Sequence, residues 1–186
     1  MSNTTPTVPP LVWIDCEMTG LDYANDTIIE IACIITDANL NVIEKGRNIV
    51  VHQPKEVMDA MNDWCKDHHG KSGLTQSVLD STTTMPEAEQ EVLALVKKHW
   101  ASPRAAVLAG NSVHADRAFL VRQMPELTEF LHYRIVDVST VKELARRWNT
   151  HVLESAPLKK ETHRALDDII ESIDELRYYK NNFFSC

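Results

Sequence analysis

Short apolar runs separated by polar turns dominate the first fifty residues and predict β-strands. Three such runs cover residues 11–17, 28–36 and 47–52, and polar segments such as DYAND and DANLN separate them. Two shorter runs, at residues 105–109 and 134–138, predict further strands in the second half of the chain.

Apolar residues spaced three or four apart predict the helices. One helix begins at a capping box formed by Thr84 and Glu87, with Pro86 in its first turn. The same spacing predicts further helices at about 115–124, 139–148 and 163–180. Residues 54–82 show a mixed pattern of short helices and loops, and residues 149–161 are predicted to form a polar loop.

The order of these elements indicates the fold class. Strands come first, and strands that alternate with helices follow them. This order predicts an α/β three-layer domain in which helices flank a mixed central sheet. The length of 186 residues suits one domain, and no repeat or low-complexity linker divides the chain. We therefore expect a single domain over residues 1–186, with residues 1–10 as a flexible N-terminal tail.

The first predicted strand carries two acids inside an apolar run, LVWIDCEMTGLD. Asp15 and Glu17 lie two residues apart, so their side chains emerge on the same face of a strand. Two like charges held this close raise each other's pKa and destabilise the fold unless something neutralises them. The neutralising partner is therefore the first question that the sequence raises.

Two further acids occupy positions where α/β folds gather their site residues. Asp116 lies at the start of a helix that follows a predicted strand, and Asp168 lies in the first turns of the last helix. Asp167 competes with Asp168, because the two flank the apolar stripe of that helix on opposite sides and periodicity does not choose between them. Asp116 taken alone would be an ordinary helix cap.

Four converging carboxylates predict a metal centre. Mg²⁺ and Mn²⁺ prefer oxygen ligands, and two such ions would balance about four negative charges. Pairs of metal ions held by carboxylates typically assist displacement at a phosphoryl centre. We therefore expect two Mg²⁺ or Mn²⁺ ions, held by Asp15, Glu17, Asp116 and Asp168.

The charge balance and the lengths of the apolar segments limit which binding partners are expected. Asp and Glu outnumber Lys and Arg by 27 to 19, which gives a net charge of −8. Proteins that bind long nucleic acid usually offer a basic stripe to many phosphates, so we expect no long nucleic-acid scaffold here. No segment approaches the roughly 18 apolar residues that span a bilayer, and the first ten residues lack the order of a secretory signal. We therefore expect no membrane partner.

The four cysteines show no metal-binding spacing. Cys16 and Cys33 lie in apolar runs, where free thiols behave as small hydrophobic residues. We therefore expect a reducing compartment, either the cytoplasm or, if a leader is missing from this chain, the mitochondrial matrix.

Four blocks of the sequence resemble the oligoribonucleases, a family within the DEDDh 3′→5′ exonucleases that has a ribonuclease H-like fold. The blocks are WIDCEMTGLD, AGNSVHADRAFL, YRIVDVSTVKELARRW and HRALDDIIESIDELRYYKNNFF, and they extend the resemblance from about Leu11 to Phe184. A lone D-x-E would be weak evidence, but four ordered blocks of this length are specific. The resemblance implies a two-metal exoribonuclease that degrades very short RNA, chiefly dinucleotides, to 5′-mononucleotides.

The resemblance also implies a role for each DEDDh residue, namely Asp15, Glu17, Asp116, His163 and Asp168. Asp15 would bridge both metals, Glu17 and Asp168 would bind one, and Asp116 would hold the other, directly or through water. His163 would be the general base that takes a proton from the attacking water, and an unperturbed pKa near 6.5 suits that task. The H-x₄-D spacing from His163 favours Asp168 over Asp167.

Substrate contacts are implied in the same way. Leu21 would wedge against a nucleobase, with Trp64 nearby. Ser112, Tyr133, Arg134 and Ser139 would cap the 5′ phosphate of a dinucleotide, with Tyr133 and Arg134 supplied by the other subunit of a homodimer. Leu21 could instead be a core leucine and Trp64 a packing residue. Tyr133 and Arg134 could be an ordinary pair of surface residues. A closed cap would measure substrate length, which suits a protein without a basic groove.

Two other functions are compatible with parts of the sequence. A DEDDh exonuclease that proofreads or repairs DNA would use the same chemistry, but a channel rich in Lys and Arg would be expected for it. A non-catalytic RNA-binding protein on the same fold would be expected to lack at least one DEDDh residue, and all five are present.

Overall fold

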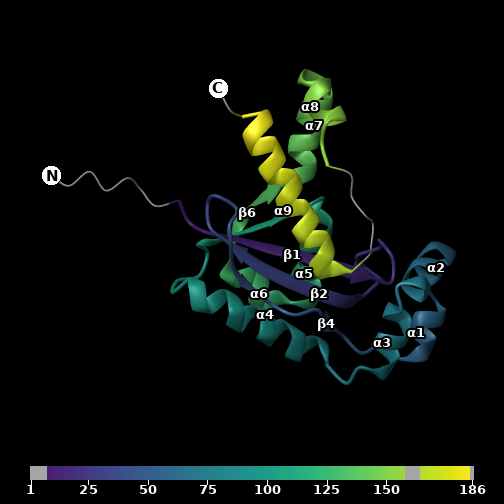
Figure 1. Cartoon of the computed structure of the whole chain (residues 1–186). Coiled ribbons are helices and arrows are strands. Elements are labelled where there is room, and N and C mark those ends of the chain that lie inside the picture. The colour runs from purple at the N-terminus through teal and green to yellow at the C-terminus, as the bar shows by residue number, and fades with distance from the viewer. Residues whose placement is uncertain (1–7, 158–163, 185–186) are drawn as a thin grey trace.

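A computed structural model describes residues 8–157 and 164–184 of the chain, and the structural statements below concern those residues. Helices cover both faces of a central sheet, so the molecule has three layers (Figure 1). Helix α9 (Ala165–Asn182) crosses one face, and helix α4 (Met85–His99) runs below the other. This arrangement confirms the predicted α/β three-layer class.

The centre of the sheet is strand β1 (Leu11–Met18), the strand that carries Asp15 and Glu17. It pairs antiparallel with β2 (Ile28–Thr36) on one side and parallel with β5 (Ala106–Gly110) on the other. The sheet is therefore mixed, as predicted.

The remaining strands extend the sheet to both edges. Strand β6 (Leu131–Asp137) lies parallel to β5, while β3 (Val42–Lys45) and β4 (Ile49–Val50) both pair antiparallel with β2. The strand order is β3-β2-β1-β5-β6, with β4 as a second partner of β2. The run predicted as a strand over residues 47–52 pairs at two residues, and β3 was not predicted because its apolar run is short and exposed.

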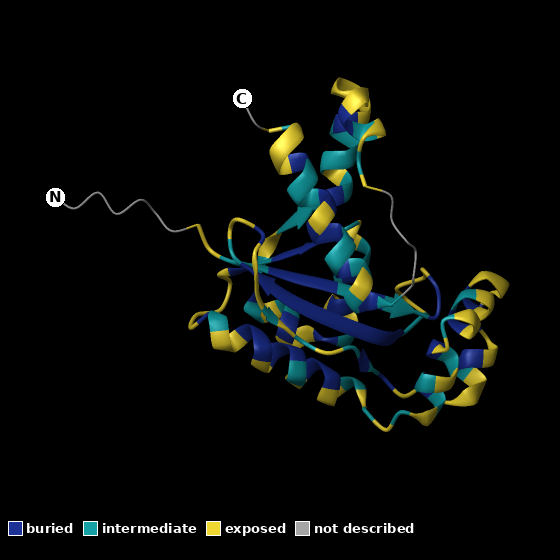
Figure 2. Ribbon diagram, viewed as in Figure 1, coloured by how far each residue is buried: buried dark blue, intermediate teal, exposed yellow. Residues whose placement is uncertain are grey.

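The two faces of the sheet pack against different helices, because alternate side chains of a strand point in opposite directions. Val12 and Ile14 belong to the core that the sheet shares with α4, helix α5 (Val113–Gln123) and helix α6 (Pro125–Phe130). Trp13 belongs to the core on the α9 side. Figure 2 shows β2 buried along its whole length, whereas β1 is buried at half of its residues and intermediate at the others.

Helix α7 (Val138–Trp148) packs beside α9 on the same side of the sheet as Trp13. Helix α8 (Thr150–Glu154) follows it at the far end of the molecule. The sequence pattern predicted a loop there, because five residues are too few to show helical periodicity.

Residues 54–82, whose pattern was mixed, form three short helices beside the N-terminal end of β2 (Figure 1). They are α1 (Lys55–Asp59), α2 (Asp63–Lys71) and α3 (Leu74–Asp80). Their apolar side chains build a small separate core together with Ile29 of β2. This group of helices forms one wall of the site described below.

The helix ends follow local capping chemistry. The Thr84 side chain accepts from the N–H of Glu87, and the Glu87 side chain accepts from the N–H of Thr84, so the predicted capping box is confirmed. Pro125 comes after the end of α5 and also begins α6, because proline fits the first helical position. Within the described residues, no helix combines the length and apolar character needed to cross a bilayer.

Candidate active site

Three carboxylates from two distant segments meet at one point. Asp15 and Glu17 project from the same face of β1, and Asp168 lies in the first turn of α9, which covers that face. One oxygen from each carboxylate lies within 4.8 Å of the others, and all three residues are half-buried. We call Asp15, Glu17 and Asp168 the acid trio.

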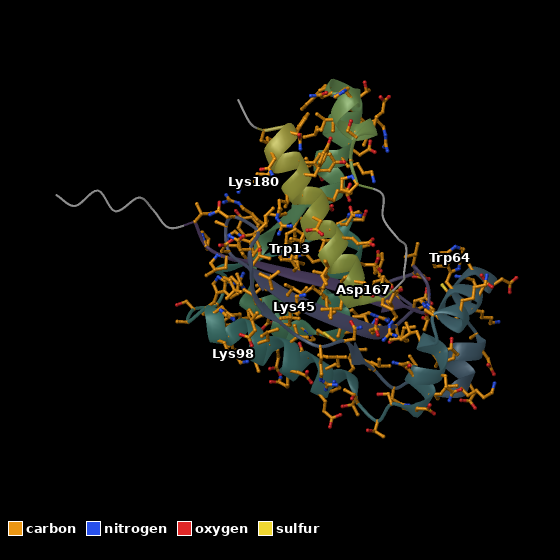
Figure 3. The ribbon with its side chains drawn as sticks, in the orientation of Figure 1. Trp13, Lys45, Trp64, Lys98, Asp167 and Lys180 are labelled. Atoms are coloured by element: carbon orange, nitrogen blue, oxygen red, sulfur yellow. The ribbon has the colours of Figure 1, made fainter. Side chains whose placement is uncertain are left out.

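Asp167 is exposed at the same end of α9, where Figure 3 labels it. Its neighbour Asp168 is the one that joins β1, so the tertiary structure makes the choice that helical periodicity left open. Asp167 lies instead near a helix N-terminus, where a solvated acid is favourable.

Asp116 lies beside the acid trio and is anchored differently. It occupies the first turn of α5 and is 6% exposed. Its Oδ1 accepts a hydrogen bond of 3.0 Å from the backbone N–H of Cys16, the residue between the two acids of β1. Burial raises the pKa of Asp116 to about 7. Asp116 thus lies next to β1, but among the described residues the carboxylates whose oxygens lie within 4.8 Å of one another are those of Asp15, Glu17 and Asp168.

Glu17 shows the electrostatic cost of this arrangement. Burial is the largest cause that raises its pKa to about 8, and the charge of Asp168 is the next. Glu30 and Asp116 raise the pKa further, whereas the guanidinium of Arg164 lowers it. A divalent cation would relieve this repulsion, and carboxylate oxygens are the donors that Mg²⁺ and Mn²⁺ prefer. The acid trio therefore fits such an ion.

A cavity of about 310 Å³ opens directly beside Glu17. Leu21 and Trp64 both line it, and their residues are 81% and 57% exposed. Neither therefore belongs to the hydrophobic core. The other lining residues are Cys16, Met18, Gly20, Cys65 and His69. The Trp64 ring stacks on His68 with 3.8 Å between the centroids, on helix α2 (Trp64 is labelled in Figure 3).

The turn that presents Leu21 depends on the glycine before it. A Cβ at Gly20 would lie 2.3 Å from Oδ2 of Asp26, which is closer than real Cβ contacts. Asp26 cannot easily withdraw, because it accepts hydrogen bonds from the Thr19 hydroxyl and from the N–H of Asp22, both at 2.9 Å. This close approach leaves Leu21 projecting from the surface beside the cavity.

Ser112 and Ser139 are held by a common carboxylate, that of Asp137. Its Oδ1 accepts from the backbone N–H of Ser112 at 2.9 Å and from the N–H and hydroxyl of Ser139 at 3.0 and 2.6 Å. Burial raises the pKa of Asp137, but hydrogen bonds from Ser139, His114 and Ser112 outweigh it and lower the pKa overall. Asp137 also caps α7, as expected for an acid in a turn.

Tyr133 and Arg134 lie on β6, at one edge of the described sheet. Tyr133 is 65% exposed, and the Arg134 guanidinium lies over its ring, 5.4 Å from the centroid. Both residues are separated from the acid trio by β5. His163, the fifth DEDDh residue, lies outside the described residues.

Comparison with known proteins identifies the family. The sequence profile of the RNase_T family, described as Exonuclease, matches residues 12–176. The protein named "Oligoribonuclease, mitochondrial" from Mus musculus is 56% identical over 174 residues, which covers 94% of this chain and 73% of that protein. "Oligoribonuclease" from Marinobacter nauticus is 53% identical over 94% of this chain and 96% of its own length. The chain belongs to the oligoribonuclease family.

Solved structures agree on the fold of this family member. Exonuclease I of E. coli in complex with a dA16 oligonucleotide superimposes with a TM-score of 0.72 over 94% of this chain and 41% of that chain. The two sequences are 14% identical, so the likeness concerns the fold alone. It confirms the expected ribonuclease H-like architecture with a mixed sheet.

One charged pair that was not predicted from the sequence lies next to the acid trio. Glu30 is the third residue of β2, is fully buried and forms an ion pair with Arg164. The signal was available, because Glu30 is a charged residue inside the apolar run IIEIACIIT. A charge buried in a strand needs a partner, as Asp15 and Glu17 do.

Proposed function

We propose that this oligoribonuclease family member is a metal-dependent 3′→5′ exoribonuclease that hydrolyses short oligoribonucleotides, chiefly dinucleotides, to 5′-mononucleotides. The observation that carries the proposal is the acid trio, in a chain that is 51–56% identical to proteins named oligoribonuclease. The oxygens of these three half-buried carboxylates lie within 4.8 Å of one another, so their negative charges need a counter-charge. The divalent metal cofactor of a nuclease would supply it.

Asp15, Glu17 and Asp168 would hold divalent cations, with Asp116 as the fourth carboxylate. We propose two ions, Mg²⁺ or Mn²⁺, because four carboxylates carry about four negative charges. When bound, the ions would stabilise the charge that develops on the phosphoryl oxygens. Asp116 is fixed to the backbone of Cys16, so the fold sets its carboxylate in place before any ion binds.

His163 is proposed as the general base, a role that rests on the resemblance. In the sequence it directly precedes Arg164, and it lies five residues before Asp168. A neutral imidazole would accept the proton of the water that attacks the phosphorus. Hydrolysis would then release a 5′-monophosphate from the 3′ end of the RNA.

The cavity beside Glu17 is proposed to take a nucleobase. Leu21 and Trp64 offer exposed apolar surface on its wall, next to a proposed metal ligand. Stacking of a base on an aromatic ring contributes roughly 1–3 kcal/mol and tolerates every base. The cavity therefore suits a nuclease that degrades RNA without regard to sequence.

We further propose that Tyr133 and Arg134 act on the site of a second copy, which makes the enzyme a homodimer. Strand register supports this proposal: Leu11 pairs with Val107, and Leu108 pairs with Ile135, so Arg134 is level with the start of β1. Asp15 is four residues further along, about 13 Å, and two strands away, about 10 Å. Both residues thus lie well away from the acid trio of their own chain.

Ser112 and Ser139 are proposed to complete a cap for the 5′ phosphate. Both lie near the C-terminal end of β6, level with the acid trio, because Gly110 pairs with Asp137. A cap at a fixed distance from the metals would exclude longer RNA. The net charge of −8 supports this idea, since an enzyme that binds two nucleotides needs to bind few phosphates.

The test is a comparison of substrates. Purified protein with Mn²⁺ should convert a 5′-labelled two-nucleotide RNA to monophosphates much faster than a seven-nucleotide RNA or single-stranded DNA. Removal of the metal with a chelator should abolish turnover, and added Mn²⁺ should restore it. Equal rates on the seven-nucleotide RNA would rule out the cap, and faster cleavage of DNA would favour the DNA exonuclease alternative.

The compartment is proposed from the thiols and the relatives. Within the described part of the chain, Cys16, Cys33 and Cys65 are buried free thiols, which suits a reducing compartment. The mouse relative is named mitochondrial, whereas others come from bacteria. We infer the cytoplasm or the mitochondrial matrix.

A further inference from the structure

The fully buried Glu30 forms an ion pair with the half-buried Arg164, directly beside the acid trio. Glu30 is 0% exposed and lies directly opposite Glu17 in the register of β1 and β2. The Arg164 guanidinium donates to its Oε1 through Nη2 at 2.7 Å and through Nε at 3.1 Å. This forked geometry requires arginine, because lysine offers a point charge without a planar fork.

The same carboxylate also holds the first turn of α9. Oε2 of Glu30 accepts a hydrogen bond of 3.0 Å from the backbone N–H of Ala165, the first residue of the helix. The next N–H, that of Leu166, donates at 3.0 Å to Oδ1 of Asn48. The N-cap residue of α9, Arg164, makes no side-chain capping bond of its own. Side chains from the sheet side therefore satisfy N–H groups that a helix start leaves open.

Asp168 lies in the same helical turn that this anchor holds. It lies three residues after Ala165, less than one helical turn away, and its carboxylate must reach Asp15 and Glu17 on β1. Because Glu30 is on β2, which is paired along its length with β1, the anchor ties α9 to the strand that carries the other two acids. A shift at Arg164 would displace Asp168 by a similar distance.

We propose that the Glu30–Arg164 pair is a positioning device, which fixes the start of α9 so that Asp168 meets Asp15 and Glu17 in metal-binding geometry. The inference rests on the proposed function, because it takes Asp168 to be a metal ligand. Stability alone is a weak reason for the pair, since an ion pair with a buried member is typically no more stabilising than apolar residues of similar volume. Residues that orient metal ligands commonly change metal affinity when they are replaced.

Replacement of the anchor tests the proposal. In Glu30→Gln and Arg164→Met, Mn²⁺ affinity measured by isothermal titration calorimetry should fall roughly 10- to 100-fold. On a dinucleotide, kcat at a fixed subsaturating Mn²⁺ concentration should fall while KM stays near the wild-type value. Arg164→Lys keeps the positive charge but not the planar guanidinium, so its Mn²⁺ affinity should lie between those of Arg164→Met and the wild type. If the other two variants do not fold, this variant is the one to measure.

Glu175 provides a matched control on the same helix. It is 2% exposed and pairs with Lys142 at 3.5 Å and with the Tyr179 hydroxyl at 3.2 Å, beyond the middle of α9. Glu175→Gln should lower the melting temperature as Glu30→Gln does, but leave Mn²⁺ affinity unchanged. Wild-type affinity in both Glu30→Gln and Arg164→Met, or an equal loss in Glu175→Gln, would overturn the positioning role alone. A wild-type protein that binds no Mn²⁺ would overturn the proposed function as well.

Discussion

The acid trio and the Tyr133–Arg134 pair differ in how the fold holds them. The three carboxylates are half-buried, come from the central strand and the helix that covers it, and lie within 4.8 Å of one another. Tyr133 and Arg134 lie on an edge strand, and Tyr133 is 65% exposed. The acid trio is a cluster of like charges that the fold of one chain brings together. Tyr133 and Arg134 instead lie on an exposed edge of the sheet, where they contact each other.

This difference suggests separate roles for the two regions: the acid trio in hydrolysis, and Tyr133 and Arg134 in recognition of the substrate. A single chain brings the proposed metal ligands together, because packing of α9 on β1 forces the acids into contact. The proposed contacts to the far end of the substrate lie on a surface that a single chain leaves open. Variants in the first region should therefore abolish turnover, while variants in the second should change which substrates are used.

The largest effect is expected at Asp168. Asp168→Asn should lower kcat at least about 10³-fold, because it removes a ligand charge that balances the metal. The neighbouring Asp167→Asn is the matched control and should stay within about 2-fold of wild type, since Asp167 is exposed. Steady-state rates on a dinucleotide, with melting temperatures for both variants, make the comparison. Equal losses in the two variants would contradict the assignment of Asp168.

A smaller effect is expected at Trp64. Trp64→Ala should lower kcat/KM for a dinucleotide about 5- to 100-fold through loss of stacking in the cavity beside Glu17. Trp148→Ala removes another exposed tryptophan, 70% exposed on α7, and should leave kcat/KM unchanged. If both tryptophan variants retain wild-type kcat/KM, the cavity does not take a base.

Arg134→Met sharpens the contrast between the two regions. It should raise KM about 10-fold for a dinucleotide with a 5′ phosphate, because a charge-assisted hydrogen bond is lost. The same variant should act normally on a dinucleotide with a 5′ hydroxyl, and its kcat should persist. Arg146→Met, another exposed arginine with its own partner in Glu143, serves as the control. A fall in kcat on both substrates would instead indicate that Arg134 acts in the hydrolysis step and not in binding of the 5′ phosphate.

The smallest effect concerns pH and stability. Glu17 and Asp116 have folded-state pKa values raised to about 8 and about 7, above their usual values near 4. The folded state thus binds protons more tightly than the unfolded state, and stability falls as pH rises through this window. Hydrogen bonds lower the pKa of other carboxylates, such as Asp37 and Glu44, which therefore titrate below this window.

Metal-free protein should therefore melt about 5–10 °C lower at pH 8.5 than at pH 5.5. Mn²⁺ should raise the melting temperature more at pH 8.5, because the ion binds the ionised carboxylates. Scanning calorimetry with and without Mn²⁺ measures both effects. A metal-free protein that is more stable at pH 8.5 would show that the repulsion among these acids is weak.

Much of the fold was predictable from local pattern. The runs that became β1, β2 and β5 were located within one or two residues, because buried strands need continuous apolar residues. The short helices α1, α2 and α3 were not resolved, and α8 was missed, because five to nine residues show too little periodicity. Leu21 also shows the limit of pattern, since a leucine after a strand gives no sign that a glycine turn exposes it.

The sequence by itself determined that Asp15 and Glu17 share one face of a buried strand, since side chains alternate along any strand. Resemblance to the family then named the other members of the site. The H-x₄-D spacing of that resemblance favoured Asp168 over Asp167, and the tertiary structure places Asp168 beside Asp15 and Glu17. Only the tertiary structure showed that Asp116 accepts from the Cys16 N–H and that Glu30 accepts from the first N–H of α9. These contacts join residues 100 or more positions apart, so they depend on how helices dock on the sheet and leave no local pattern in the chain.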